Sequence, residues 1–269
     1  MERRFLQIFL MLAGLLAAGA LRAEQVLVRH AEGVARGFLV LRAQDGGAAL
    51  ADGDLIQTSR GDRVTTRVVF HFKDGSIHDE TVVFSQKERF RLISDHLVQK
   101  GPSFPHPIET SIDVTTGLIT VKSRTDDGKE KLDQDRLDLP PDVANGLMFT
   151  LLKNIGPDPP GTTLSMVAAT PKPLLVKLVL SPASEDRVTL GSSTHKSVRY
   201  ATQIEIGGVK GVLATLLGKK PPVTYVWMLS GEAPTFIKAE GPLFFGGPVW
   251  HIELACPDQP RPPSPTSRP

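Results

Sequence analysis

Hydrophobic and polar positions alternate in short runs over most of this chain, and turn residues separate the runs. Runs of this kind, rich in β-branched and aromatic residues, predict strands. In the first half we expect strands at residues 37–42, 63–72, 77–84, 89–94, 108–114 and 118–123. In the second half we expect them at residues 163–169, 174–180, 187–190, 198–206, 223–229, 235–239 and 249–254. Turn signals recur roughly every 10 to 15 residues, which favours an antiparallel meander over βαβ units.

One segment departs from the strand pattern and predicts a helix at residues 142–155. Apolar residues recur there every four positions, as on the buried face of a helix: Val143, Leu147, Leu151 and Ile155. Prolines precede the segment, and Gly156 and Pro157 end it. We therefore expect a mainly β fold, a curved antiparallel sheet that forms a half-barrel or an open barrel around one central helix. Residues 24–256 are expected to form this single domain.

The N-terminus has the order of a secretory signal peptide at residues 1–23. Arg3 and Arg4 precede an almost wholly apolar stretch at residues 5–20, and small residues follow. Cleavage is expected near Ala23, with Ala20 as the alternative site. An uncleaved anchor is the other interpretation, but about 20 apolar residues are needed to span a bilayer. The sequence thus predicts a periplasmic or secreted protein with no transmembrane segment in the mature chain.

Composition narrows the function classes. The single cysteine, Cys256, excludes an internal disulfide and a cysteine-based zinc site. The whole chain carries a formal net charge of +2, but the leader holds three arginines and one glutamate, so the mature chain has 28 basic and 28 acidic residues. A neutral chain without a long basic cluster does not favour nucleic acid as a partner. Residues 257–269 are rich in proline, and we expect this tail to be disordered.

The last three predicted strands carry a resemblance to a known family. They follow one another as Val223–Leu229, 234–238 and 247–254, and a Leu-Pro-Pro-Asp turn at residues 139–142 precedes the predicted helix. This arrangement resembles exported β proteins of unknown function of the DUF3108 type. Those proteins are in turn similar to the lipoprotein-carrier half-barrels (LolA/LolB-like). The resemblance implies a curved sheet around a helix with an apolar groove, and it carries over no catalytic residues.

The best candidate metal site lies at the hairpin formed by Asp74 and Gly75. In a two-residue hairpin His71 faces His78, and Glu80 follows on the same side, a set of ligands suited to zinc or copper. A one-residue bulge at Gly75 would instead pair His71 with Ile77 and place His78 on the other face. Solvated histidines near a hairpin tip are the simpler interpretation.

A candidate ligand-binding groove rests on large apolar residues. The segment 212–217 between glycines is either a lid over an apolar groove or a core helix. Tryptophans either fill the concave side of the sheet or line a groove there. The residues expected to contact a ligand are Leu147, Leu151, Leu213, Leu216, Trp227 and Trp250.

Together these features predict an exported, non-enzymatic protein that binds a lipid or another hydrophobic ligand and needs no cofactor. The first alternative is a structural or protein-interaction module of the cell envelope. The second is a hydrolase or metal enzyme with dispersed catalytic residues, although the chain has no Gly-x-Ser-x-Gly or His-Glu-x-x-His motif.

Overall fold

The computed structural model describes residues 25–44, 47–125, 127–156, 161–168, 170, 172–190, 192–205 and 222–255. The predicted signal peptide, the candidate lid with Leu213 and Leu216, and the proline-rich tail lie outside the described residues. Of the helices that the structure describes, none has the length and hydropathy needed to cross a bilayer.

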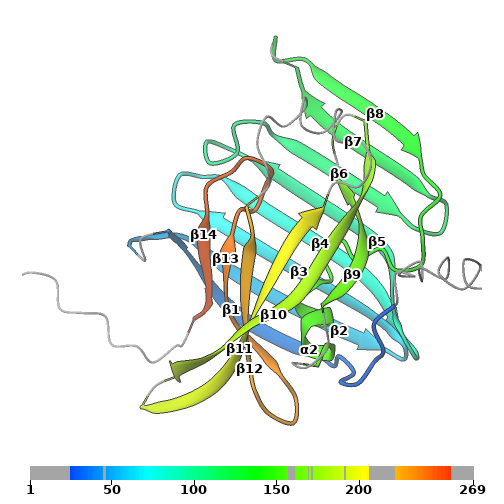
Figure 1. Ribbon diagram of the computed structural model, residues 1–269. Coiled ribbons are helices and arrows are strands. Elements are labelled where there is room, and N and C mark those ends of the chain that lie inside the picture. The colour runs from blue at the N-terminus through cyan, green and yellow to red at the C-terminus, as the bar shows by residue number, and fades with distance from the viewer. Residues whose placement is uncertain are drawn as a thin grey trace, which may run out of the picture.

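All the named strands belong to one antiparallel sheet of 14 strands (Figure 1). The first half of the chain contributes β1 (Ala35–Ala43), β2 (Ala49–Arg60), β3 (Arg63–Phe72), β4 (Ile77–Gln86), β5 (Phe90–Lys100), β6 (Ile108–Asp113), β7 (Leu118–Arg124) and β8 (Glu130–Arg136). The second half contributes β9 (Thr162–Ala168), β10 (Leu174–Leu190), β11 (Ser193–Glu205), β12 (Thr224–Leu229), β13 (Thr235–Gly241) and β14 (Trp250–Leu254). Each half is a meander, and pairing of β1 with β14 joins the two halves. The expected antiparallel fold is confirmed.

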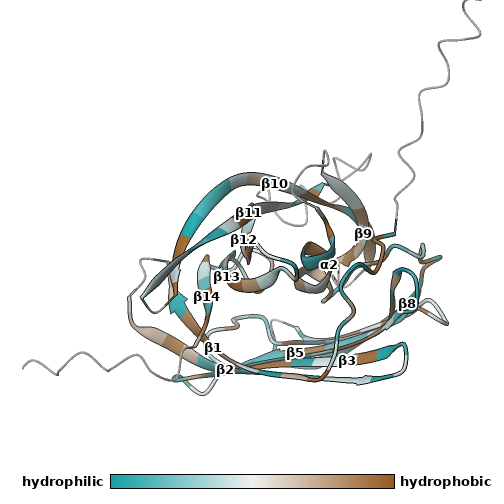
Figure 2. Cartoon of the chain, turned by 90° about the horizontal axis from the view of Figure 1, so that it is seen from below, coloured by the Kyte–Doolittle hydropathy of each residue, from teal (hydrophilic) through white to brown (hydrophobic). Residues whose placement is uncertain are grey.

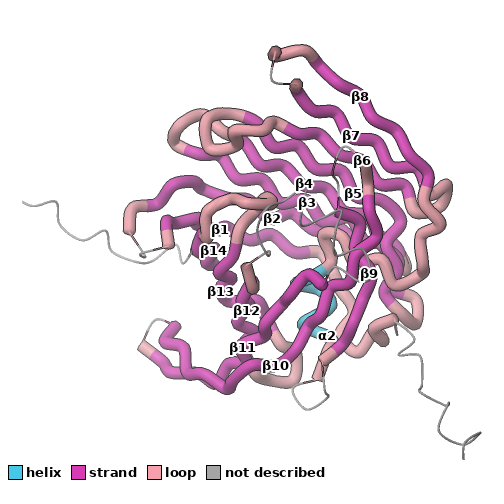
Figure 3. The backbone as a smooth tube through the Cα atoms, turned by 45° about the horizontal axis from the view of Figure 1, so that its top comes forward, coloured by secondary structure: helices cyan, strands magenta, loops and turns pink. Residues whose placement is uncertain are grey.

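The sheet rolls up so that its two halves face each other across a hollow. Seen from below, β9 to β14 arch over the flatter floor formed by the strands of the first half (Figure 2). The short helix α2 (Met148–Asn154) lies inside this hollow (Figure 3). The edge strands β8 and β9 are not paired with each other, so the barrel is open.

The helix is shorter than the predicted span of residues 142–155, which is a correction at its N-terminal end. Residues 142–144 run beside β9, because Val143 forms a parallel bridge with Ser165. The next residue, Asn145, donates a hydrogen bond to the carbonyl of Val167 and accepts one from its N–H, at 2.9 and 2.8 Å. Gly146 then adopts a left-handed φ of 65°, which an α-helix excludes. Helical geometry therefore begins only after this glycine.

The strands β2 and β8 are absent from the predicted set, and two predicted strands form one continuous strand. The turn-like Asp52-Gly53-Asp54 lies inside β2, where Gly53 leaves space for a neighbour: a Cβ there would be 2.6 Å from the ring of Phe70. β8 is a charged edge strand, as its alternating acidic and basic residues indicate. Predicted strands 174–180 and 187–190 join through Pro182 into β10, with a register shift between Pro182 and Ser184.

Two hydrophobic clusters flank the hollow. The larger cluster surrounds α2 and includes Leu151 and Leu152 together with inward-facing residues of both halves of the sheet. The smaller cluster is aromatic: Phe72, Phe104 and Trp250 pack with ring centroids 5.3 to 6.1 Å apart. Between the clusters the side chains leave a cavity.

Candidate ligand-binding cavity

A cavity of about 870 Å³ lies between α2 and the inner face of the rolled sheet. Its lining is mainly apolar, and both halves of the sheet contribute to it. Representative apolar lining residues are Val68, Leu97, Ile108, Met148, Met166 and Phe236. The volume lies within the range of about 300 to 1,000 Å³ that is usual for small-molecule sites.

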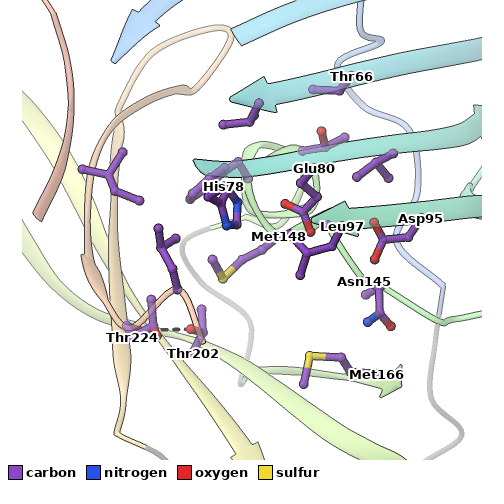
Figure 4. Close-up of a pocket in the computed structure, with 18 of the residues that line it drawn as sticks. Thr66, His78, Glu80, Asp95, Leu97, Asn145, Met148, Met166, Thr202 and Thr224 are labelled. Atoms are coloured by element: carbon purple, nitrogen blue, oxygen red, sulfur yellow. Dashed lines mark hydrogen bonds between the residues drawn. The ribbon is translucent and has the colours of Figure 1, made fainter. Parts of the chain in front are cut away.

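The register of the floor strands places one carboxylate in the middle of the cavity floor. Glu80 on β4 is paired with Val68 on β3 and with Leu97 on β5. Side chains of paired residues point to the same face of a sheet. Glu80 therefore stands among apolar neighbours, and Figure 4 shows it between His78 and Asp95 on the floor strands.

A bulge brings a second carboxylate to the same face. Between β4 and β5, Val83 is paired with Ser94 and Phe84 with Leu92, so Ile93 is an extra residue on β5. One extra residue reverses which side chains of a strand point inward. Asp95 is consequently 5% exposed and lines the cavity, one step diagonally from Glu80.

Burial shifts both carboxyl groups toward the protonated form. Burial raises the pKa of Glu80 to about 7. Burial also raises the pKa of Asp95 well above its usual range, and the nearby charge of Glu80 raises it further. Within the described part of the chain, Oδ1 of Asp95 is buried without a hydrogen-bond partner. A buried polar atom in this state is rare in folded proteins and calls for a ligand or a proton.

The loop before α2 lies close to Glu80. A Cβ at Gly146 would lie 2.2 Å from Cγ2 of Val82 and 3.3 Å from Oε1 of Glu80. The backbone of the loop thus lies directly against the floor strand that carries Glu80. Asn145 fixes the loop by its two hydrogen bonds to Val167.

His78 lies on the floor beside Glu80 and is neutral. Its Nδ1 lies 2.9 Å from Nε2 of Gln99, which also donates to the carbonyl of Leu243 at 2.8 Å. Since the amide nitrogen is a donor, Nδ1 is the acceptor and carries no proton. Burial, with Phe70 and Phe104 against the ring, lowers the pKa of His78 to about 4.

A separate polar group near α2 is internally paired. The carboxylate of Glu32 accepts from Nζ of Lys153 at 3.3 Å and from Nε2 of Gln57 at 3.0 Å. Thr66 donates to Oε1 of the same Gln57 at 2.9 Å. These partners satisfy one another, in contrast to the carboxyl pair on the floor.

The structure does not bring the three candidate metal ligands together. The pairing of His71 with Ile77, and of Phe70 with His78, is the bulged register, with Gly75 at a φ of 84°. His71 therefore lies exposed on the outer face, whereas His78 and Glu80 share the inner face. Among the described residues, no group of three or more His, Cys, Asp or Glu side chains is placed to hold a metal ion.

The four predicted ligand-contacting residues that the structure describes are buried but lie outside the cavity lining. Leu147 and Leu151 belong to the core around α2, and the helix presents Met148, Phe149 and Lys153 to the cavity instead. Trp250 belongs to the aromatic cluster.

Trp227 also lies outside the lining. Its Nε1 donates to Oδ2 of Asp186 at 2.7 Å, and Nζ of Lys238 lies 4.0 Å from its ring centroid. These contacts give Trp227 a structural role.

The fold and the cavity define an open, barrel-like β protein with an internal, mainly apolar cavity. Among solved structures, the chain is similar to the "Beta-barrel-like Protein of Domain of Unknown Function DUF1849 from Brucella abortus". The two are 9% identical, with a TM-score of 0.46 over 83% of this chain and 96% of the other. No family model matches the chain, and no curated protein matches it in sequence. The comparison does not extend to the DUF3108 type or to the lipoprotein carriers.

Proposed function

We propose that this protein binds a lipid or another elongated hydrophobic molecule in the cavity and has no catalytic activity of its own. The observation that supports this proposal is the mainly apolar cavity of about 870 Å³ inside a folded domain. The cavity is partly open to solvent, so a ligand could enter it, and its size is usual for a small-molecule site. The signal-peptide-like N-terminus fits a carrier or sensor that acts outside the cytoplasm.

The expected affinity follows from apolar burial. Each buried methylene contributes about 0.8 kcal/mol, so a chain of about ten methylenes contributes roughly 8 kcal/mol. Loss of translational and rotational freedom offsets at least ~4 kcal/mol of this. An alkyl chain alone would therefore bind weakly, and polar groups in the cavity would decide which ligand is retained.

Filling the cavity provides the test. The neutral fluorophore N-phenyl-1-naphthylamine, which brightens in apolar surroundings, should bind the mature protein with saturable fluorescence. Leu97→Trp, on the inner face of β5, should weaken this signal because the larger indole takes up part of the cavity.

The matched control is His96→Trp, which places the same side chain at the exposed position next to Leu97. This variant should bind the fluorophore normally. The proposal is wrong if the wild-type protein gives no saturable signal, or if both variants bind as the wild type does.

A further inference from the structure

We propose that Glu80 and Asp95 form a binding site for the amine head group of an amphiphile whose alkyl chain occupies the cavity. This inference rests on the proposed function, since it assigns the polar end of the same ligand. Its basis is the placement of two carboxyl groups on an apolar floor, one with an unpartnered buried oxygen.

The described residues do not supply this carboxyl pair with the partners that buried charges require. Buried carboxylates are normally paired with cations or hydrogen-bond donors. The basic side chain that α2 contributes to the lining, Lys153, is paired with Glu32. Gln99 on β5 donates to His78 and to the carbonyl of Leu243. Oδ1 of Asp95 is thus left for a donor that the described part of the chain does not supply.

The chemistry of the pair favours an amine over other head groups. Ionised carboxyl groups only accept hydrogen bonds, and an ammonium group offers three donors and a compensating charge. A hydroxyl group offers one donor and no charge, and an anionic head group would be repelled. Calcium takes six to eight oxygen ligands, far more than two carboxyl groups provide. An alkyl amine therefore matches both the apolar walls and the acidic floor.

Binding should depend on pH through the carboxyl pair. Titratable or charged side chains that line the cavity are Glu32, Arg36, His78, Glu80, Asp95, His106 and Lys153. Within this set, the charge of Glu80 is the one that shifts the pKa of Asp95. At pH 8 an alkyl amine is still charged, because amines of this type titrate near pH 10. At pH 5.5 the pair retains protons and cannot fully compensate the ammonium charge, so the preference for amine should shrink.

Displacement of the bound fluorophore separates this inference from the proposed function. Dodecylamine, dodecanol and dodecanoate have the same chain length and differ in the head group. At pH 8 and below micellar concentrations, we expect dodecylamine to displace the fluorophore with an inhibition constant at least tenfold lower than that of dodecanol. This ratio corresponds to the strength usual for hydrogen bonds to charged groups. Dodecanoate should be the weakest of the three.

Isosteric variants assign the effect to the pair. Asp95→Asn and Glu80→Gln should each reduce the amine-to-alcohol preference about tenfold while dodecanol binds as before, which also shows that the variants fold. Asp79→Asn is the matched control: Asp79 neighbours Glu80 on β4 but is paired with Arg67 on the outer face. This control should keep the full preference.

Each outcome decides between the two proposals. Equal binding of amine and alcohol to the wild-type protein overturns the amine site and leaves the proposed function intact. A preference that survives in both Asp95→Asn and Glu80→Gln also overturns the amine site. Failure of all three compounds to displace the fluorophore overturns the proposed function, and the amine site with it.

Discussion

Replacing Glu80 with Gln should change how stability depends on pH, because the folded protein holds the Glu80 proton more tightly than the unfolded chain does. Burial raises the pKa of Glu80 from 4.5 to about 7. Between these values the folded state binds more protons than the unfolded state, so the free energy of unfolding falls as the pH rises. Below pH 4.5 this penalty is absent, and above pH 7 it is complete.

The size of the effect follows from the shift. One pKa unit corresponds to about 1.4 kcal/mol, so the rise from 4.5 to about 7 corresponds to about 3 kcal/mol. Asp95 acts in the same direction, and removal of the Glu80 charge relieves part of its penalty as well. Relative to the wild type, Glu80→Gln should therefore gain about 3 kcal/mol of stability between pH 4 and pH 8.

Urea unfolding of both proteins across this pH range measures the difference directly. The difference between the two proteins is needed, since groups common to both cancel. Asp79→Asn is the control: its ion pair with Arg67 lowers the pKa of Asp79, so its titration lies below the window. This control should differ from the wild type by a constant amount. A difference between wild type and Glu80→Gln that does not change with pH would refute the burial of a titrating carboxyl group on the floor.

Two further predictions test the same region. His78→Asn should remove a pH dependence of stability that has the opposite sign. Burial lowers the pKa of His78 to about 4, so the wild type loses stability as the pH falls from 6.5 toward 4. Urea midpoints of the variant should lack this loss. Gly146→Ala should destabilise by roughly 2 kcal/mol or more, because a φ of 65° strains alanine and its Cβ would overlap Val82. Gly128→Ala is the control, because Gly128 has a φ of 81° and a Cβ there would have no atom within 4 Å. This variant should lose only about 1 kcal/mol of stability. Equal losses of melting temperature in the two variants would contradict the overlap with Val82.

The alternation of hydrophobic and polar residues predicted the sheet well. Most strands pair with their neighbours in the sequence, and each has one solvent-exposed face and one buried face. The predicted strand 63–72 matches β3 at both ends. The strand β2 was missed because Asp52-Gly53-Asp54 has turn composition, and only tertiary packing of Phe70 against Gly53 explains a glycine there. Contacts between distant segments cannot be inferred from spacing in one chain.

The N-terminal end of the helix α2 also depends on contacts between distant segments, so the sequence pattern did not predict it. A period of four continues from Val143 to Ile155, yet the first residues of this run pair with β9. Their apolar side chains are buried in either conformation, so periodicity does not distinguish them. The glycine at position 146 and the hydrogen bonds of Asn145 decide the outcome, and the partner of those bonds, Val167, is 22 residues away.

The candidate site depends on a single inserted residue in the sheet. Counting by twos along β5 from the buried Leu92 places Ser94 and His96 on the inner face and Asp95 in solvent. The extra residue Ile93 reverses this assignment, so Asp95 faces the cavity and His96 the solvent, where it meets Glu109 at 3.2 Å. Along β4, in contrast, alternation from Phe84 correctly places Glu80 inward. Sequence alternation therefore finds one carboxylate of the pair and misses the other, and only the bulge places both side chains of the proposed amine site on the same face of the sheet.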